Sequence, residues 1–349
     1  MRILCTVGDC NGIGLEVWAK ALLQLQGHRA LRGVTVTLIA HPETVRQYFD
    51  ALTLPVHVTA SELTVGTLRI ELFPCFTYAP IRWGTADTAA ARQAWEALQI
   101  ARELLSRRAA DAVVTLPITK HLLHRLGWDF PGQTEFFAPT AQSPPLMLFV
   151  AGTLRIGLVT THLPLRAVPE AFTPDAVRQR LIQLHAVLQQ DFAIATPRIA
   201  LLGLNPHAGE DGTLGTEEQL LLPTLEQLRA EGYCCDGPFA ADAFFGQRRW
   251  RAYHAVLAAY HDQGLIPFKL LAQHRGVNFT AGLPFVRTSP AHGTAYDIAG
   301  RGMANPGSMR HALLLALQLA RRRSTAQSHN PNNHNAGQRH SLPHHLAST

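Results

Sequence analysis

Three histidines are notable because each comes directly after a short apolar run. His162 follows RIGLVTT, His207 comes soon after RIALLGL, and His261 follows AVLAAY. Such runs are typical of buried strands, and each histidine then lies in or beside a loop-like segment with glycine or proline. Because parallel strands end at one edge of their sheet, these side chains can converge there. Three imidazoles and an open position form the protein half of a catalytic site for zinc or a similar divalent metal.

The alternative reading is that these are ordinary loop histidines. A single histidine in a loop such as GLNPHAGEDG is more often a surface or hydrogen-bonding residue than a ligand. The spacing is also too long for a local metal motif such as H-E-x-x-H. The pattern alone therefore leaves both readings open.

A second group of candidate residues could bind an anion. Residues 274–308 are dense in glycine and proline, so we expect a loop there, and Lys269 lies just upstream. The polar residues of this segment include Asn278, Arg287, Thr288, Ser289 and His292. Cationic and hydroxyl groups together suit a phosphate or carboxylate, although any single arginine is usually a surface charge.

Two further segments give weaker signals. GDCNGIG, Gly8 to Gly14, lies between a strand pattern and a helix pattern, so its backbone N–H groups could meet an anion. Its spacing is not G-x-G-x-x-G, and a tight turn would require the same glycines. FPGQTEFFA, with Gln133 and Thr134, fits a helix start or the rim of a site.

Apolar strand patterns alternate with amphipathic helix patterns along the chain, which predicts an α/β fold with a largely parallel sheet. The length of 349 residues suits two domains or one large α/β unit. Thr173 and Thr216 each precede a helix pattern that soon contains an acidic residue, as N-cap residues do. Residues 325–349 are polar and rich in histidine, and we expect a disordered tail there.

The composition argues against several classes of protein. Five cysteines without a C-x-x-C pattern fit reduced thiols in a cytoplasm better than disulfides. We find no signal peptide pattern and no apolar run of about 18 residues, so we expect no membrane span. The net charge of +6 is spread rather than clustered with aromatic residues, which argues against nucleic-acid binding and fits a small anionic substrate.

Seven segments, taken together and in order, resemble the motifs of the 4-hydroxythreonine-4-phosphate dehydrogenase family. They are GDCNGIGLE, TLPITK, PGQTEFFA, THLPLRAVP, GLNPHAGEDGTLGTEE, YHDQGLIPFK and RGVNFTAGLPFVRTSPAHGTAYDIAGRG. The resemblance covers residues 1 to about 324. It implies an isocitrate/isopropylmalate dehydrogenase-like fold of two α/β domains with a cleft between them, in a homodimer whose active sites are completed by the partner subunit. The expected domains are residues 1–120 with 285–324, and residues 121–284.

The resemblance also implies roles for individual residues. The metal ligands would be His162, His207 and His261, which hold zinc, with magnesium or cobalt as alternatives. The substrate contacts would be Gln133, Thr134, Lys269, Asn278 and Arg287. Lys269 is the candidate for proton transfer, with Asp242 as the alternative base, and Asp262 is another acidic position of the family. HGTAYDIAGRGMANP and GDCNGIGLEV are similar to the cofactor loops of the isocitrate-type enzymes, which suggests that Gly12, Gly14, His292 and Asp297 bind NAD or NADP.

The implied reaction is the NAD(P)-dependent oxidation of 4-phosphooxy-L-threonine to a 3-oxo acid, which decarboxylates to 3-amino-2-oxopropyl phosphate in pyridoxal phosphate biosynthesis. The sequence departs from the family at Gln133, where the family has a histidine, and in GDCNGIGLE, where GDPAGIGPE is usual. The departure at Gln133 favours the first of three alternatives, and the other two come from different classes of protein. The three are a dehydrogenase of a sugar-acid phosphate such as threonate or erythronate 4-phosphate, a metal-dependent hydrolase, and a binding protein that has lost activity.

Overall fold

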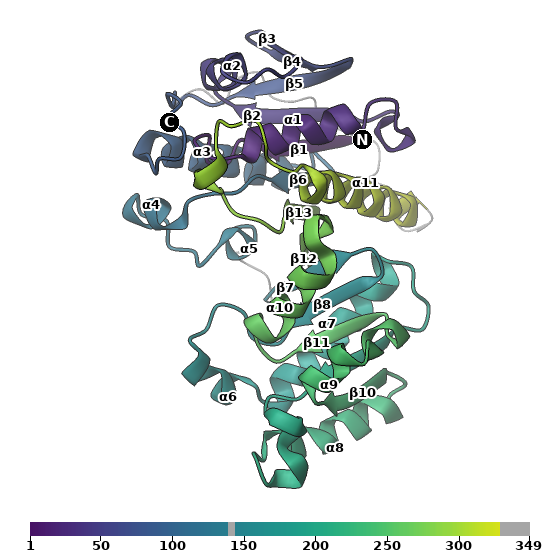
Figure 1. Ribbon diagram of the computed structural model, residues 1–349. Helices are drawn as coiled ribbons and strands as arrows, with labels where there is room; N and C mark the ends of the chain where they lie inside the picture. Colours follow the sequence, from purple (N-terminus) through teal and green to yellow (C-terminus); the bar gives the residue numbers. More distant parts are fainter. Residues whose placement is uncertain (139–143, 329–349) are drawn as a thin grey trace. The chain divides into compact units, whose positions relative to one another are not determined.

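The computed structural model describes residues 1–138 and 144–328, and the chain divides into two compact units (Figure 1). Unit 1 comprises Met1–Phe137 and the chain from Leu283 onward, and unit 2 comprises Ala138–Gly282. The first boundary comes later than the one expected at residue 120. The reason is an aromatic cluster in which Trp128 stacks on Phe136 at 4.7 Å and meets Trp95 edge-on at 6.2 Å, so that the segment after residue 120 packs against unit 1.

Unit 1 contains a sheet in the order β13-β6-β1-β2-β5-β4-β3. The pairs from β13 to β5 are parallel, and β5, β4 and β3 form antiparallel pairs. The strands are β1 (Arg2–Thr6), β2 (Thr35–Ala40), β3 (Val56–Val58), β4 (Glu62–Val65), β5 (Leu68–Pro74), β6 (Ala112–Thr115) and β13 (Val286–Pro290). The helices are α1 (Gly14–Gln24), α2 (Pro42–Asp50), α3 (Thr88–Ser106), α4 (Lys120–Arg125), α5 (Gln133–Phe136) and α11 (Gly307–Ser328).

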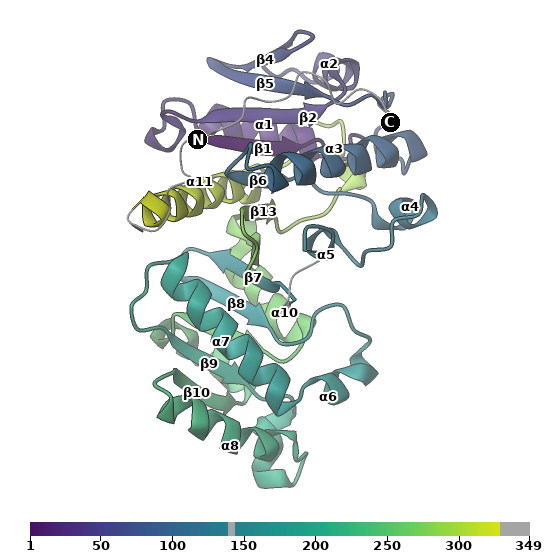
Figure 2. The same cartoon turned by 180° about the vertical axis from the view of Figure 1, so that it is seen from behind.

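The central strands of unit 1 lack polar alternation because helices cover both faces of the sheet. β6 is buried at every residue, as expected for a parallel strand between two helix layers. The helix α3 begins where the Asp87 side chain accepts hydrogen bonds from the N–H groups of Ala89 and Ala90. Figures 1 and 2 show α1 and α11 on one face of the sheet and α3 on the other.

Unit 2 contains a sheet in the order β10-β9-β11-β8-β7-β12. The four strands from β10 to β8 are parallel, whereas β7 is antiparallel to both β8 and β12. The strands are β7 (Leu146–Ala151), β8 (Leu154–Leu158), β9 (Arg198–Leu202), β10 (Cys234–Phe239), β11 (Ala255–Ala258) and β12 (Val277–Ala281). The helices are α6 (Val168–Ala171), α7 (Pro174–Gln190), α8 (Glu217–Ala230), α9 (Ala241–Gly246) and α10 (His261–Ala272). Within this unit α10 covers one face of the sheet and α7 covers the other (Figures 1 and 2).

The α/β class is confirmed, but several local predictions were wrong. Residues 274–308 are not one long loop, because β12 and β13 lie within them. Their apolar residues alternate over too few positions for the strands to stand out among the glycines and prolines. The Thr173 side chain caps α7 by accepting from the Ala176 N–H, whereas the Thr216 side chain makes no capping bond because its backbone is already helical.

The C-terminal region differs in part from the expectation. α11 continues to Ser328, four residues into the segment expected to be a disordered tail from residue 325. The rest of that tail, residues 329–349, lies outside the described residues. Within residues 1–138 and 144–328, no helix is both long enough and apolar enough to span a bilayer.

Candidate functional site

The three predicted ligand histidines follow three neighbouring strands of unit 2. β11 lies between β9 and β8 and pairs with both in parallel, so all three carboxyl ends lie at one edge. The Thr160 N–H and hydroxyl both donate to the Ala259 carbonyl, at 3.1 and 2.8 Å, just beyond the ends of β8 and β11. This connection brings the His162 and His261 rings to 6.2 Å between centroids.

His261 lies at the first position of α10 and not in a loop as expected from the YHDQG sequence. Its Nδ1 lies 2.6 Å from the Asp262 Oδ1. A carboxylate on one ring nitrogen fixes the tautomer and leaves Nε2 available as a ligand, as second-shell carboxylates do in metal sites. Asp262 therefore has a physical role beside the histidine that its sequence position alone did not indicate.

His207 is exposed on the turn after β9. In the part of the chain that the structure describes, no three histidine, cysteine, aspartate or glutamate side chains are grouped closely enough to hold a metal ion. The structure thus brings His162 and His261 together but does not gather His207 with them. The donor set still fits a divalent metal in chemistry, because all three imidazoles lie on adjacent strand ends and two of them are neighbours.

One residue that the sequence reasoning missed connects two of these strand ends. The Gln263 side chain accepts a hydrogen bond from the Ala259 N–H at 2.7 Å and donates to the Gly203 carbonyl at 2.6 Å. It thereby joins the end of β11 to the end of β9. Nothing in the sequence spacing pairs residue 263 with residue 203, so only the folded sheet could reveal it.

The other predicted residues of unit 2 lie on separate elements. Asp242 is exposed in the first turn of α9, which follows β10, the neighbour of β9. Lys269 is exposed on α10, and Asn278 lies on β12. The Asn278 Oδ1 is buried and has no hydrogen-bond partner among the residues that the structure describes. A buried amide oxygen in that state is available to accept from a ligand.

Unit 1 contains a buried cationic cluster around Arg287. The guanidinium, only 3% exposed, donates to the Thr115 hydroxyl at 2.7 Å, to the Gln133 Oε1 at 3.1 Å and to the Thr134 hydroxyl at 3.4 Å. Burial lowers the pKa of Arg287 to about 10, against the opposing effect of the Glu135 carboxylate. The group is therefore a cation at neutral pH, held rigidly by neutral side chains, as a site for phosphate or carboxylate requires.

The three predicted residues Gln133, Thr134 and Arg287 are thus in direct contact. They come from the start of α5 and from β13, with Thr115 at the end of β6. The Gln133 Nε2 also donates to the Leu116 carbonyl at 3.2 Å, so both ends of this amide are engaged by the protein. Thr115 was not predicted, because a threonine at the end of an apolar run carries no signal of its own.

The glycine-rich loop of residues 8–14 is fastened within unit 1. The N–H groups of Asn11 and Gly12 donate to Asp9, and the Ile13 N–H donates to the Thr294 carbonyl at 3.0 Å. A Cβ on Gly12 would lie 2.6 Å from the same Thr294 oxygen. These donors and this glycine serve contacts inside the unit, and a role of Gly12 and Gly14 in cofactor binding remains a prediction.

The segment with His292 and Asp297 is fastened to that loop. The Tyr296 and Thr119 hydroxyls both lie 2.5 Å from the buried Asp9 Oδ2. The Lys20 Nζ donates to the Gly302 carbonyl at 2.7 Å, and the buried Glu16 carboxylate accepts from the Ala304 N–H at 2.8 Å. The segment is therefore held by polar contacts along its length, as a preorganised cofactor loop would be.

We expect Tyr296→Phe to loosen this segment while the protein stays folded. Losing a hydrogen bond to a charged acceptor costs about 1.5–3 kcal/mol, so the melting temperature should fall by several degrees. The resemblance implies that this segment binds a nicotinamide cofactor, and in that case the KM for the cofactor should rise more than kcat falls. Differential scanning calorimetry and steady-state kinetics measure the two effects. Tyr78→Phe is the control, because the hydroxyl of this exposed tyrosine accepts a hydrogen bond from Gln47 at the surface and lies in no contact with Asp9. Unchanged values in the Tyr296 variant would contradict the expectation.

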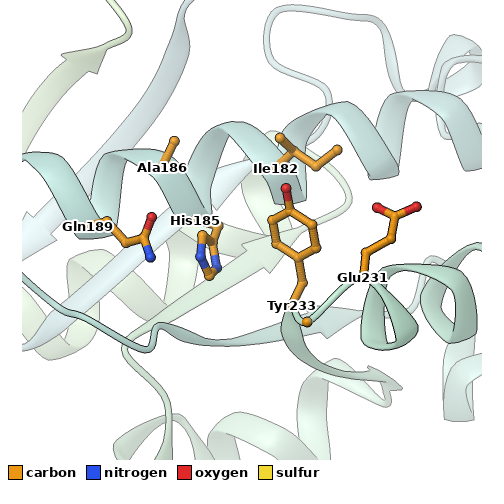
Figure 3. A pocket seen from close by; sticks show the side chains of 7 residues that line it. Ile182, His185, Ala186, Gln189, Glu231 and Tyr233 are labelled. Carbon is orange, nitrogen blue, oxygen red and sulfur yellow. The ribbon is translucent and has the colours of Figure 1, made fainter.

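One pocket of unit 2 lies apart from these residues (Figure 3). Its volume is about 300 Å³, and its lining residues are Ile182, His185, Ala186, Gln189, Glu231, Gly232 and Tyr233. The His185 and Tyr233 rings meet edge to face at 4.8 Å. These residues come from the last part of α7 and from the segment before β10, so they lie at the amino ends of the parallel strands. His162, His207 and His261 follow the opposite, carboxyl ends of these strands, where α/β sheets bind their ligands. We call this edge of the sheet the histidine edge.

Comparison with known proteins identifies the family. The family model described as "Pyridoxal phosphate biosynthetic protein PdxA" matches residues 32–316. The chain belongs to this family. It is 40% identical to the 4-hydroxythreonine-4-phosphate dehydrogenase of Bacteroides thetaiotaomicron, over 93% of this chain and 90% of that one. It is 45% identical to the enzyme of the same name from Erythrobacter litoralis, over 92% and 97% of the two chains.

Solved structures agree with this assignment. The crystal structure of 4-hydroxythreonine-4-phosphate dehydrogenase from Klebsiella pneumoniae has a TM-score of 0.75 and 33% identity, covering 91% of this chain and 98% of that chain. A terephthalate 1,2-cis-dihydrodiol dehydrogenase from Burkholderia xenovorans has a TM-score of 0.58 and 26% identity, covering 91% and 98%. The fold of this PdxA family member is therefore shared with a dehydrogenase of another substrate.

Proposed function

We propose that this PdxA family member catalyses the NAD(P)-dependent oxidation of 4-phosphooxy-L-threonine to 2-amino-3-oxo-4-phosphooxybutanoate, which decarboxylates to 3-amino-2-oxopropyl phosphate. The observation that carries the proposal is similarity over nearly the whole chain to enzymes named for this reaction. The buried cation Arg287 and the histidine edge support it, because the substrate is an anion and its oxidation needs a polarised hydroxyl.

The histidines His162, His207 and His261 would hold a divalent metal, for which zinc fits the imidazole ligands, with magnesium or cobalt as alternatives. When bound, such a metal lowers the pKa of a coordinated hydroxyl and stabilises developing negative charge. NAD or NADP supplies the hydride acceptor. The Asp262 carboxylate contacts one ring nitrogen of His261, so the other ring nitrogen would be the one that holds the metal.

The remaining groups bind the substrate or move protons. Arg287, held by Thr115, Thr134 and Gln133, binds an anionic group of the substrate without rearranging. The unpartnered Asn278 Oδ1 accepts a hydrogen bond from a substrate donor. Lys269 delivers or removes a proton, with Asp242 as the alternative base. Gly12, Gly14, His292 and Asp297 contact the cofactor.

The test is reduction of NAD, and separately of NADP, with 4-phosphooxy-L-threonine, followed by the absorbance of the reduced cofactor. The protein is stripped of metal and assayed with and without added zinc or magnesium. We expect the reduced cofactor to form only when zinc or magnesium is added. A folded, metal-loaded protein that produces neither NADH nor NADPH with this substrate would refute the proposed substrate.

A second candidate is a dehydrogenase of the same type acting on a sugar-acid phosphate such as threonate or erythronate 4-phosphate. It is favoured by one observation: Gln133 stands where the resemblance implies a histidine, and both ends of its amide are engaged by Arg287 and Leu116. A changed contact at this position can change the substrate. The same assay with these acids distinguishes the two candidates by their kcat/KM values.

We also propose a homodimer in the cytoplasm. All five cysteines are free thiols, which fits a reducing compartment. On α10, Ile266 is 60% exposed and Leu270 is 74% exposed, and their spacing of four residues places them on one face. An exposed apolar face of this kind is typical of a protein interface, and a second copy of the chain would cover it.

We expect Leu270→Glu to convert the dimer into monomers, because it places a charge in an apolar contact. Light scattering after size exclusion measures the mass directly, and the same substitution at the exposed Leu220 on α8 is the control. The dimer should survive in the control and dissociate in the α10 variant at micromolar concentration. An α10 variant of unchanged mass would rule out this face as the interface.

A further inference from the structure

The backbone that carries His207 has an unusual handedness. The five residues from His207 to Asp211 all have positive φ, with values of 52°, 54°, 81°, 43° and 53°. Only Gly209 among them lacks a Cβ, and left-handed backbone costs the other residues about 1–2 kcal/mol each. A left-handed turn of this length persists only when its surroundings hold it, and such strain is concentrated at functional sites.

Glu218, near the start of α8, is the residue that holds the left-handed turn in place. Its side chain is only 4% exposed. The Oε1 accepts from the Asn205 N–H at 2.7 Å, and the Oε2 accepts from the Asn205 Nδ2 at 2.9 Å. The carboxylate therefore binds the residue that precedes the turn twice, once through the backbone and once through the side chain.

The carboxylate also fits against the turn itself. A Cβ on Gly209 would lie 2.6 Å from the Glu218 Oε2, and a Cβ on Gly203 would lie 3.0 Å from the Oε1. These two glycines thus let the carboxylate sit between the strand end and the middle of the turn. The Asn205 Nδ2 donates in addition to the Glu217 Oε2 at 2.7 Å, which fixes the amide from a second side.

We propose that Glu218 is a positioning residue for His207, acting through Asn205 and the left-handed turn. Glu218 contacts the strand end at Gly203, the entry to the turn at Asn205 and its centre at Gly209, but its role is exerted through the backbone that carries the imidazole. This inference rests on the proposed role of His207 as a metal ligand. It predicts that the cost of the strained turn is offset by Glu218 so that the imidazole is in place before the metal binds.

The test measures zinc affinity of the full-length protein by competition with a chromophoric chelator. In Glu218→Gln, an NH2 group must face a donor of Asn205, so one of the two bonds is lost. We expect zinc affinity to fall about 10–100-fold, as for other residues that orient metal ligands. Glu226→Gln is the matched control, because Glu226 is an exposed residue of the same helix. Its affinity should equal that of the wild type.

A second substitution separates positioning from a general loss of stability. Glycine adopts positive φ without strain, so Ala208→Gly lowers the cost of the turn. Added to Glu218→Gln, it should restore part of the lost zinc affinity. Because relief of strain also stabilises the fold, every variant is assayed at a temperature where circular dichroism shows that it is fully folded, so that the affinity reports the position of the imidazole. If Glu218→Gln does not fold, the same measurement is made on Asn205→Ala with and without Ala208→Gly.

Each outcome decides the inference. A loss of affinity that Ala208→Gly partly reverses supports it. Wild-type affinity in Glu218→Gln, together with lost affinity in His207→Ala, overturns the inference but leaves the proposed metal site intact. A loss that Ala208→Gly does not reverse also overturns it. If the wild type binds no zinc, cobalt or magnesium, the proposed role of His207 fails and the inference fails with it.

Discussion

Replacing His261 by alanine is expected to remove tight zinc binding and to lower the turnover of 4-phosphooxy-L-threonine by about 10³-fold or more. A bound metal contributes several kcal/mol of transition-state stabilisation, and each 1.36 kcal/mol corresponds to about tenfold in rate. His261 lies beside His162 at 6.2 Å between ring centroids and is oriented by Asp262. Its loss therefore removes one of the two neighbouring histidines at this sheet edge.

The measurement pairs zinc content after dialysis with steady-state kinetics in added zinc. Asp262→Asn should have a smaller effect, of about 10–100-fold on zinc affinity. A neutral amide can still orient the His261 ring, but it raises the basicity of the ring nitrogen that binds zinc less than a carboxylate does. His185→Ala is the matched control, since His185 lies in the pocket at the opposite end of the strands. A His261→Ala protein that retained zinc and full turnover would exclude this histidine as a ligand.

The placement of the histidines could be predicted from the sequence because each follows a run of apolar residues. A buried parallel strand needs no polar alternation, so it can be recognised in the sequence as a continuous apolar run. Polar residues that follow such a run must lie near the edge of the sheet. The order β9-β11-β8 could not be read in this way, since strand order depends on packing between distant segments. The same limit hid Gln263, which joins two strand ends through contacts that no spacing in the sequence announces.

The buried cationic cluster around Arg287 shows a second limit. The glycines and prolines around Arg287 predict a loop, yet this residue lies on β13 and is buried. A buried guanidinium is possible only because side chains from β6 and α5 accept its hydrogens, and these partners are more than 150 residues away in the chain. The resemblance to a known family identified Gln133, Thr134 and Arg287, whereas Thr115 was found only in the folded protein.

The glycine-rich loop of residues 8–14 shows a third limit. The GDCNGIG pattern suggested N–H groups free to bind an anion, but those of Asn11, Gly12 and Ile13 donate within unit 1. Asn11 adds further bonds, since its Oδ1 accepts from the Arg82 N–H at 2.7 Å and its Nδ2 donates to the Thr85 carbonyl at 3.0 Å. Asn11 departs from the family pattern, yet its hydrogen bonds stabilise the loop. The departure therefore gives no reason to expect loss of the fold.

Replacing Arg287 by lysine is expected to lower kcat/KM about 10–150-fold, mostly through KM. A hydrogen bond to a charged group contributes about 1.5–3 kcal/mol, and an ammonium cannot reach the Thr115, Thr134 and Gln133 oxygens from one position as the planar guanidinium does. The lysine keeps the positive charge, so the decrease in kcat/KM measures the contribution of the guanidinium's geometry. Gln133→Glu tests the charge instead: a carboxylate 3.1 Å from the guanidinium would neutralise it and weaken binding of an anionic substrate.

Steady-state kinetics over pH distinguish this role from a structural one. Burial lowers the pKa of Arg287 to about 10, so the guanidinium is charged at neutral pH and loses its proton as the pH rises through about 10. Binding of the anionic substrate should weaken over that range in the wild type. Arg92→Lys, an exchange at an exposed arginine of α3, is the control and should leave kcat/KM unchanged. If Arg287→Lys also kept its kcat/KM, the buried cation would serve the packing of unit 1, and the anion would have to be bound by other residues.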